Sequence, residues 1–380
     1  MALEEIFETW KSNVEKVIEK NPLNVIHWES TRRCNLRCKH CESPTEGSRD
    51  ESELTTEQVI KGFRKIRNQI DMSNFSRVLI SGGEPFVRKD LVPVVFELGE
   101  IGYQNISIQS NGIYIADHPE VLEQLKKTNV TGIGVAVDGL ESTHDDFRQM
   151  KGSWQKSLRA LEYSVDAGFQ TTASITAHAK NVDELGELYE LLSDRGVNWF
   201  KITPIYPLGR TVINQDLLLS PDQTRTLIDF LKTKHRENFR NYADPKTTKV
   251  DMGCGDWTGV ENEGRFRPYC FFCVAGLNTM TILYDGKITG SNIARDFVEG
   301  TLDDDLGKLW NEGFQRYRNR GWLKQDDCGS CGEWDYCKGG PMHLRLPNGT
   351  LLSCLYQTLH GKDYRPKIKE IAGEILKCKI

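Results

Sequence analysis

An alternation of apolar strands and amphipathic helices runs through residues 24–212 and constrains the fold more than any other feature of the sequence. Helices are expected to begin at favoured N-cap residues such as Thr55 or Thr56, and to end at glycines such as Gly102 and Gly168. Strand–helix units in series form a parallel sheet with right-handed crossovers, but six units are too few to close an eight-stranded barrel. We therefore predict an α/β fold, a partial (β/α)6 TIM barrel that binds ligands at the carboxyl ends of its strands. The expected strands are 25–30, 77–81, 105–110, 132–137, 171–176 and 199–205.

The sequence changes character from Cys254 onward, where cysteine, glycine and aromatic residues become frequent. The stretch "TILYDGKIT" predicts a β-hairpin that turns at Asp285 and Gly286. We expect a second, smaller unit stabilised by metal. The predicted organisation is an N-terminal helix (1–22), the partial barrel (23–212), a helical linker (213–250), a cysteine-rich α+β domain (251–360) and a C-terminal helix (361–380).

The composition excludes several classes of protein. A net charge of −5 over 380 residues gives no electrostatic footprint for nucleic acid. No stretch of about 18 apolar residues could span a membrane, and the N-terminus lacks the apolar core of a signal peptide. We expect a cytoplasmic protein that binds neither nucleic acid nor membrane.

Ten of the eleven cysteines fall into three groups, with three at 34–41, three at 254–273 and four at 328–354, and Cys378 stands alone near the end. An odd number of cysteines in a chain without a signal peptide argues against a disulfide framework and for metal ligands or reactive thiols.

The first group, Cys34, Cys38 and Cys41, follows the first predicted strand with spacings of three and two residues. Four thiolates would close an iron–sulfur cubane and make it an electron carrier, whereas three thiolates leave one iron open. An open iron can ligate a substrate directly and pass an electron to it. The alternatives are a zinc site with His40 as its fourth ligand, and three inert thiols.

This pattern resembles the signature of the radical S-adenosylmethionine enzymes, whose cysteines follow the first strand of a partial barrel. His40 stands where that family usually has an aromatic residue beside the cofactor. "SGGEP" resembles the family's loop for the amino group of S-adenosylmethionine. Its glycines allow a close approach of backbone, its glutamate offers an acceptor and its proline fixes the turn. The resemblance assigns cofactor binding to Gly82, Gly83, Glu84, Pro85, Ser110, Asn111, Asp138, Thr176 and Arg210.

The resemblance also implies a reaction and its cofactors. A [4Fe–4S] cluster on the three cysteines would leave its fourth iron for S-adenosylmethionine, and one electron would cleave the sulfonium. The products would be methionine and a 5′-deoxyadenosyl radical that abstracts a substrate hydrogen. Asp138, at the end of the fourth strand, is a tentative catalytic proton acceptor, with ribose binding or helix capping as alternatives. A flavodoxin or ferredoxin would supply the electron.

The last cysteine group resembles the SPASM extension of this family. Cys328, Cys331 and Cys337, together with the distant Cys354, would hold an auxiliary [4Fe–4S] cluster, with zinc as the alternative.

The middle cysteine group departs from the SPASM pattern. Ser291 and Pro341 stand where the family often has cysteines. The group would then either hold a second auxiliary cluster with an open or non-cysteine fourth position, or consist of buried thiols. The tentative metal ligands of this group are Cys254, Cys270 and Cys273.

The resemblance leaves the substrate open. Asn292 replaces an aspartate that acts as a base in the sulfatase-maturing branch, which disfavours that activity. Modification of a peptide or protein side chain is the first expectation, and the peptide would then need either a separate leader-peptide-binding protein as a partner or direct docking to the enzyme. The alternatives are the same chemistry on a sugar, tetrapyrrole or cofactor precursor, and a non-catalytic iron–sulfur or zinc scaffold. If the substrate is a peptide, we expect an open groove between the barrel and the C-terminal unit. If it is a small molecule, we expect an enclosed pocket.

Overall fold

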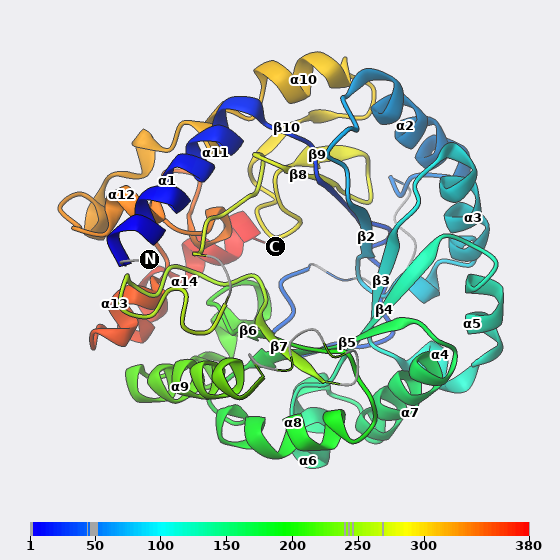
Figure 1. Ribbon diagram of the computed structural model, residues 1–380, viewed down its shortest axis with the longest axis horizontal. Helices are drawn as coiled ribbons and strands as arrows, with labels where there is room; N and C mark the ends of the chain where they lie inside the picture. Colours follow the sequence, from blue (N-terminus) through cyan, green and yellow to red (C-terminus); the bar gives the residue numbers. More distant parts are fainter. Residues whose placement is uncertain are drawn as a thin grey trace.

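A single curved sheet organises the chain (Figure 1). The computed structural model describes residues 3–43, 45, 52–238, 241, 244, 247–267 and 270–379. Within them, ten strands follow the order β10-β9-β8-β1-β2-β3-β4-β5-β6-β7. All pairings from β8 to β7 are parallel, whereas β8–β9 and β9–β10 are antiparallel. The strands are β1 Val25–Glu29, β2 Arg77–Ser81, β3 Ile106–Ser110, β4 Val130–Ala136, β5 Gln170–Ala177, β6 Trp199–Pro204, β7 Lys249–Met252, β8 Thr279–Ile282, β9 Lys287–Thr289 and β10 Val298–Thr301.

The helices surround the sheet as an outer layer, and local sequence signals explain several of their ends. Thr55 caps α2 in a capping box with Gln58, and Gly102 ends α3 with a left-handed φ of 105°. In the part of the chain described, no helix is long and apolar enough to cross a membrane. The helices are α1 Leu3–Lys20, α2 Thr56–Gln69, α3 Leu91–Ile101, α4 Ile113–Asp117, α5 Glu120–Leu125, α6 Glu141–Arg148, α7 Ser153–Asp166, α8 Leu185–Ser193, α9 Pro221–Asn238, α10 Leu306–Glu312, α11 Gln315–Arg318, α12 Trp334–Cys337, α13 Leu355–Leu359 and α14 Arg365–Lys379.

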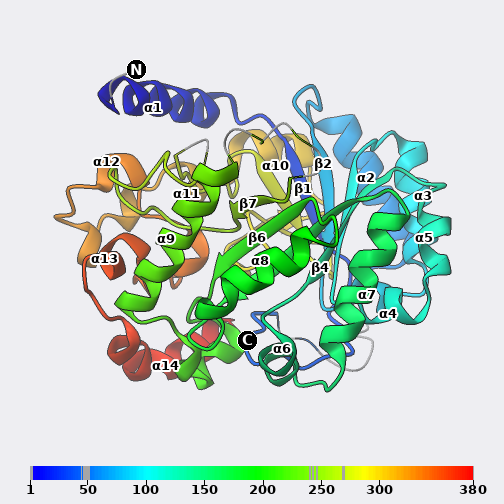
Figure 2. The ribbon, with the colours of Figure 1, turned by 60° about the horizontal axis from the view of Figure 1, so that its bottom comes forward.

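The predicted partial α/β barrel is confirmed, and all six expected strands are present within one or two residues. The sheet also extends beyond them at both edges. β7 follows the expected linker, of which residues 239, 240, 242, 243, 245 and 246 lie outside the described residues. β8 pairs with β1, and the predicted turn at Asp285 and Gly286 joins β8 to β9. The cysteine-rich region is therefore joined to the barrel through the sheet itself (Figure 2).

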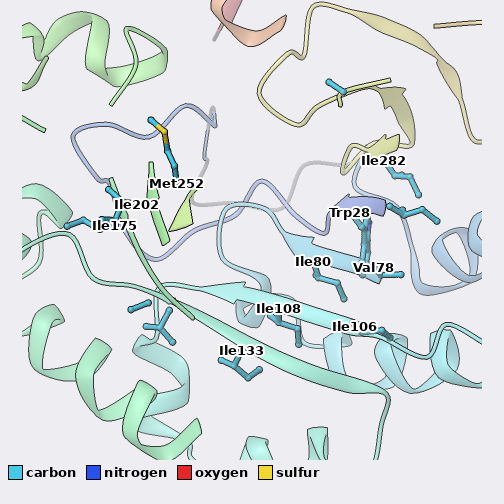
Figure 3. Close-up of a cluster of buried hydrophobic side chains, with 14 of the residues drawn as sticks. Trp28, Val78, Ile80, Ile106, Ile108, Ile133, Ile175, Ile202, Met252 and Ile282 are labelled. Atoms are coloured by element: carbon cyan, nitrogen blue, oxygen red, sulfur yellow. The ribbon is translucent and has the colours of Figure 1, made fainter. Parts of the chain in front are cut away.

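The hydrophobic core lies between the strands and the outer helices. Figure 3 shows side chains of this layer, which come from strands across the sheet and include Ile80, Ile108 and Ile133. Because successive strand residues point to opposite faces, the alternate positions face the lumen of the barrel. Those positions include Ser174 and Lys201, which line a cavity. The fold thus packs most of its apolar strand residues against the outer helices and leaves a chamber with several polar side chains within the barrel.

Candidate active site

The chamber has a volume of about 390 Å³ and opens at the carboxyl ends of the parallel strands. Its lining joins the first cysteine loop, the loop after β2, the lumen faces of β4–β6 and part of the C-terminal region. Of the residues predicted from the sequence to bind metal or cofactor, it contains Cys34, Cys38, His40, Cys41, Gly82, Gly83, Glu84, Ser110, Asn111, Asp138, Thr176, Arg210 and Cys254. A larger groove of about 1,100 Å³ lies on the outer surface against α2 and α3, but none of these residues lines it.

The three cysteines of the first group share one wall of this cavity. The backbone N–H of Leu36 donates to Cys34 Sγ at 3.4 Å. Burial raises the pKa of Cys34 to about 12, and negative charge on Cys38 or Cys41 would raise it further. A bare Cys34 thiol would stay protonated, whereas a bound metal would deprotonate it. Three thiols on one cavity wall, of which Cys38 is buried and the other two are half-buried, fit the three-thiolate ligation of an iron–sulfur cluster, as does the N–H aimed at one sulfur.

Gly82 and Gly83 hold the cysteine loop in place. Gly83 N donates to Thr31 O at 2.7 Å, and Glu84 N donates to Arg33 O at 2.8 Å. A Cβ on Gly83 would lie 2.2 Å from Arg33 O, and one on Gly82 would lie 2.5 Å from Thr31 O. The sequence suggested that these glycines allow backbone to approach a ligand. The structure adds that they allow two loops of the protein to meet.

Glu84 joins the loops after β2 and β3. Its buried carboxylate accepts hydrogen bonds from Ser110 Oγ at 2.9 Å and from Asn111 N at 2.7 Å. Burial raises its pKa, and these hydrogen bonds oppose that shift. Asn111 Nδ2 also donates to Asn35 Oδ1 at 2.7 Å, which ties the β3 loop to the cysteine loop. Pro85 begins the short 3-10 turn that follows Glu84.

Asp138 is fully buried and already has a partner. Arg148 Nη2 and Nε lie 2.5 Å from Asp138 Oδ2, and Thr176 N donates to Oδ1 at 2.7 Å. Burial pushes the pKa of Asp138 upward, but the charge of Arg148 and the other neighbouring groups together outweigh burial, and the pKa falls below its usual value. Arg148 Nη1 also lies 3.7 Å from Cys38 Sγ. Sequence reasoning missed Arg148, although it lies only ten residues after Asp138.

His40 lies in an aromatic stack. Its ring packs face to face on Phe147 at 4.4 Å between centroids, and Phe147 stacks on His178 at 4.1 Å. Burial lowers the pKa of His40 to about 3, so the ring is neutral. It therefore has the packing environment of the aromatic residue that the family usually has at this position.

Arg210 lies against the cysteine loop. Its Nε donates to Cys38 O at 2.7 Å and its backbone N–H donates to Cys41 O at 3.1 Å. A Cβ on Gly209 would lie 2.3 Å from Cys41 O, so the loop after β6 packs directly on this backbone.

The last cysteine group surrounds a small second cavity, lined by Cys328, Cys331, Cys337 and Cys354. Arg345 is fully buried beside it, and its Nη2 donates to Cys328 Sγ at 3.0 Å. The guanidinium also donates to the carbonyls of Gly339 and Gly349, and no described carboxylate lies within ion-pair distance of it. A buried cation needs a counter-anion. Four thiols beside a buried guanidinium therefore fit a bound anionic cluster.

The middle cysteine group is less compact. Cys254 is exposed only to the chamber, and its Sγ lies 3.8 Å from His343 Nδ1. Burial raises its pKa to about 12, and Cys273 contributes in the same direction. Cys270 instead packs in an aromatic cluster with Trp257. Across the described residues, no three His, Cys, Asp or Glu side chains form a group arranged to hold a single metal ion.

Comparisons with known proteins agree with this geometry. The family model of the Radical SAM superfamily matches residues 28–192. Fe-coproporphyrin III synthase of Methanosarcina barkeri is 30% identical over 344 residues, covering 84% of this chain and 83% of that protein. Mycofactocin maturase MftC of Mycolicibacterium smegmatis is 30% identical, covering 85% and 79%, respectively. AdoMet-dependent heme synthase of Methanosarcina barkeri is 29% identical, covering 89% and 97%.

Solved structures share the fold. The structure described as native anSMEcpe with bound AdoMet and Cp18Cys peptide superposes with a TM-score of 0.64 at 17% identity, covering 93% of this chain and 99% of that one. The alternative of a non-catalytic scaffold is set aside. The chain belongs to the radical S-adenosylmethionine superfamily, so it is an enzyme that uses a [4Fe–4S] cluster and S-adenosylmethionine, and its C-terminal region is rich in cysteine.

Proposed function

We propose that this enzyme abstracts a hydrogen atom from a substituent of a tetrapyrrole. The observation that carries the proposal is the position of the chamber. It lies inside the barrel, and Cys254, Asn292 and Ile293 of the C-terminal region contribute to its lining. Its volume of about 390 Å³ suits a cofactor and the reacting end of a substrate, while the rest of a large ring would remain at the mouth.

Different residues of the chamber would hold the cluster, fix the loops and bind the cofactor's carboxylate. Cys34, Cys38 and Cys41 would hold the open cluster, which when bound supplies the electron that cleaves S-adenosylmethionine reductively. Glu84 fixes the spacing of the two neighbouring loops, because its carboxylate bridges Ser110 and Asn111 in the folded chain. Arg210 brings a cation to the cluster wall for the cofactor's carboxylate.

Asp138 is proposed as a positioning residue and not as a proton acceptor. Its carboxylate is ionised, buried and engaged by Arg148, so accepting a proton would break a buried ion pair. Through Arg148 it orients the side chain beside Cys38, and through its bond to Thr176 N it fixes the end of β5.

The relatives support a tetrapyrrole by name, since Fe-coproporphyrin III synthase, AdoMet-dependent heme synthase and pre-heme d1 synthase are among them. Peptide or protein modification, the first expectation from the sequence, is the second candidate. It is favoured by the maturase MftC at 30% identity over a similar share of the chain. A peptide end could enter the same chamber, and the peptide would then bind either directly or through a leader-peptide-binding protein.

The test is an anaerobic turnover assay of the reconstituted enzyme with dithionite, S-adenosylmethionine and Fe-coproporphyrin III. We expect the tetrapyrrole to raise 5′-deoxyadenosine formation above the substrate-free rate and to change in mass. 5′-Deoxyadenosine formation that the tetrapyrrole does not stimulate, with no change in its mass, would refute the tetrapyrrole and leave the peptide candidate. Cys34→Ala serves as the inactive control.

A further inference from the structure

Lys201 is a charged side chain inside the chamber that the proposed mechanism does not use. It is the third residue of β6, between the buried Phe200 and Ile202, so it projects from the lumen face. Its side chain is exposed to the chamber that it lines.

The ammonium of Lys201 forms no hydrogen bond or ion pair with any described residue. Asp251 is its Cα partner in the pairing of β6 with β7, yet their side chains do not reach ion-pair distance among the described contacts. Of the carboxylates that line the chamber, Asp138 pairs with Arg148, Glu84 accepts hydrogen bonds from the loop after β3, and Glu42 has interactions of its own. No described carboxylate therefore lies within ion-pair distance of the Lys201 ammonium.

Two side chains from other elements lie near Lys201 in the chamber. His27 also lines it and donates to, or accepts from, Ser81 Oγ at 2.6 Å. Burial lowers the pKa of His27 to about 4, and the charges of Lys201 and Arg295 contribute. Cys254 of the C-terminal region lies within the electrostatic reach of Lys201. The lysine therefore faces the space between the barrel and the C-terminal region.

Lys201 is exposed in the chamber, so an occupant packed against it would shield its ammonium from solvent. A desolvated cation is costly unless an anion accompanies it, so the occupant must bring one. The carboxylate of S-adenosylmethionine would be used at the cluster wall, beside Arg210. The second anion must then come from the substrate.

We infer that Lys201 binds a carboxylate on the reacting end of the substrate. The identity of the molecule that carries this carboxylate rests on the proposed function. In a coproporphyrin, the propionate groups would supply the carboxylate. Lys201 would be a specificity residue, which selects an acid over its ester and sets which substituent enters the lumen.

The test measures binding to the reconstituted enzyme with S-adenosylmethionine, without reductant. Three probes are used: coproporphyrin III, its tetramethyl ester, and propionate, which has the carboxylate without the ring. We expect Lys201→Gln to lower the affinity for coproporphyrin III and for propionate by about tenfold to a hundredfold, which is the effect of losing one charge-assisted hydrogen bond. Lys201→Arg should retain most of the affinity, and the ester should bind weakly and equally to all variants.

A matched control is Lys156→Gln, because Lys156 is a surface lysine paired with Asp117 and lies outside the chamber. Propionate binding that depends on Lys201, with no binding of coproporphyrin III, would refute the proposal that the substrate is a tetrapyrrole and would support the role of Lys201 in binding a carboxylate. Lys201→Gln with unchanged affinity for both acids would overturn the inference, as would propionate binding to neither protein. Equal iron content and equal binding of S-adenosylmethionine in the variants exclude a folding defect.

Discussion

Replacing Asp138 by asparagine should destabilise the protein, because it leaves Arg148 without its counter-charge. The Asp138 and Arg148 side chains are 1% and 11% exposed and lie 2.5 Å apart. Removing one partner of a buried ion pair costs about 3–5 kcal/mol, since the remaining charge stays desolvated. Domains are stable by about 5–15 kcal/mol, so the loss is a large fraction of the total. The loss is measured by urea unfolding of the cluster-free protein under anaerobic conditions, where it appears as a lower urea concentration at the midpoint of unfolding.

A double-mutant cycle separates the charge effect from lost packing. Arg148→Met removes the cation as well, so Asp138→Asn with Arg148→Met should cost less than the sum of the two single changes by at least about 1 kcal/mol. The control is Glu123→Gln, which breaks an exposed pair with Lys126 and should change stability by less than about 1 kcal/mol. Additive effects at Asp138 and Arg148, or a loss at Asp138 as small as the control, would refute the reasoning.

The pH dependence of this loss has a definite sign. The pKa of Asp138 is lower in the folded protein than its usual value, so its contribution is present above the unfolded pKa of about 3.9. The contribution disappears as the pH falls through the folded pKa. The stability difference between the native protein and Asp138→Asn should therefore be full near neutral pH and narrow in strongly acidic solution. A difference that grows on acidification would contradict the assignment.

Three further changes test the two metal sites. Cys34→Ala should abolish 5′-deoxyadenosine formation, because two thiolates cannot hold the open cluster; a turning-over variant would contradict this. Gly83→Ala should lower iron loading at the same site, since its Cβ would lie 2.2 Å from Arg33 O; unchanged iron content would show that the loops can separate freely. Arg345→Met should lower the midpoint potential of the auxiliary cluster in an electron paramagnetic resonance titration, because it removes a cation and a hydrogen bond from Cys328. A tenfold smaller ratio of reduced to oxidised cluster corresponds to a shift of about 59 mV for one electron. An unchanged potential would contradict the role of Arg345 beside the cluster.

The strands and several helix ends could be predicted because their signals are local. A run of apolar residues, a capping threonine such as Thr55 or a glycine such as Gly102 acts within a few residues. The cysteines of the first and last groups could be grouped for the same reason, since short spacing implies nearness in space. Strand β8 could not be placed this way, because its pairing with β1 joins residues about 250 positions apart.

The side chains that set the electrostatics of the sites were missed because their partners are distant or unremarkable in sequence. Arg345 carries no motif, and only the fold places its guanidinium on Cys328. Asp138 was recognised as a site residue, but its partner Arg148 was not, so its charge state could not be judged. Lys201 did have a signal. In "WFKITPI" it alternates with residues that pack in the core, which puts it on the opposite face.

The separation of the hydrophobic core from the lumen explains how a barrel of this kind can evolve to act on a new substrate while it keeps its fold. In a closed barrel the lumen is filled by branched apolar side chains and is itself a core. Here the core lies outside the strands, where residues such as Ile133 and Ile108 are almost completely buried, and the lumen holds Lys201 and Ser174 around a cavity. A change such as Ile133→Ala would cost about 2–5 kcal/mol, whereas a lumen residue that contacts mainly the occupant of the chamber costs little to replace. Selection on the substrate can therefore act on the lumen positions while the outer layer maintains stability.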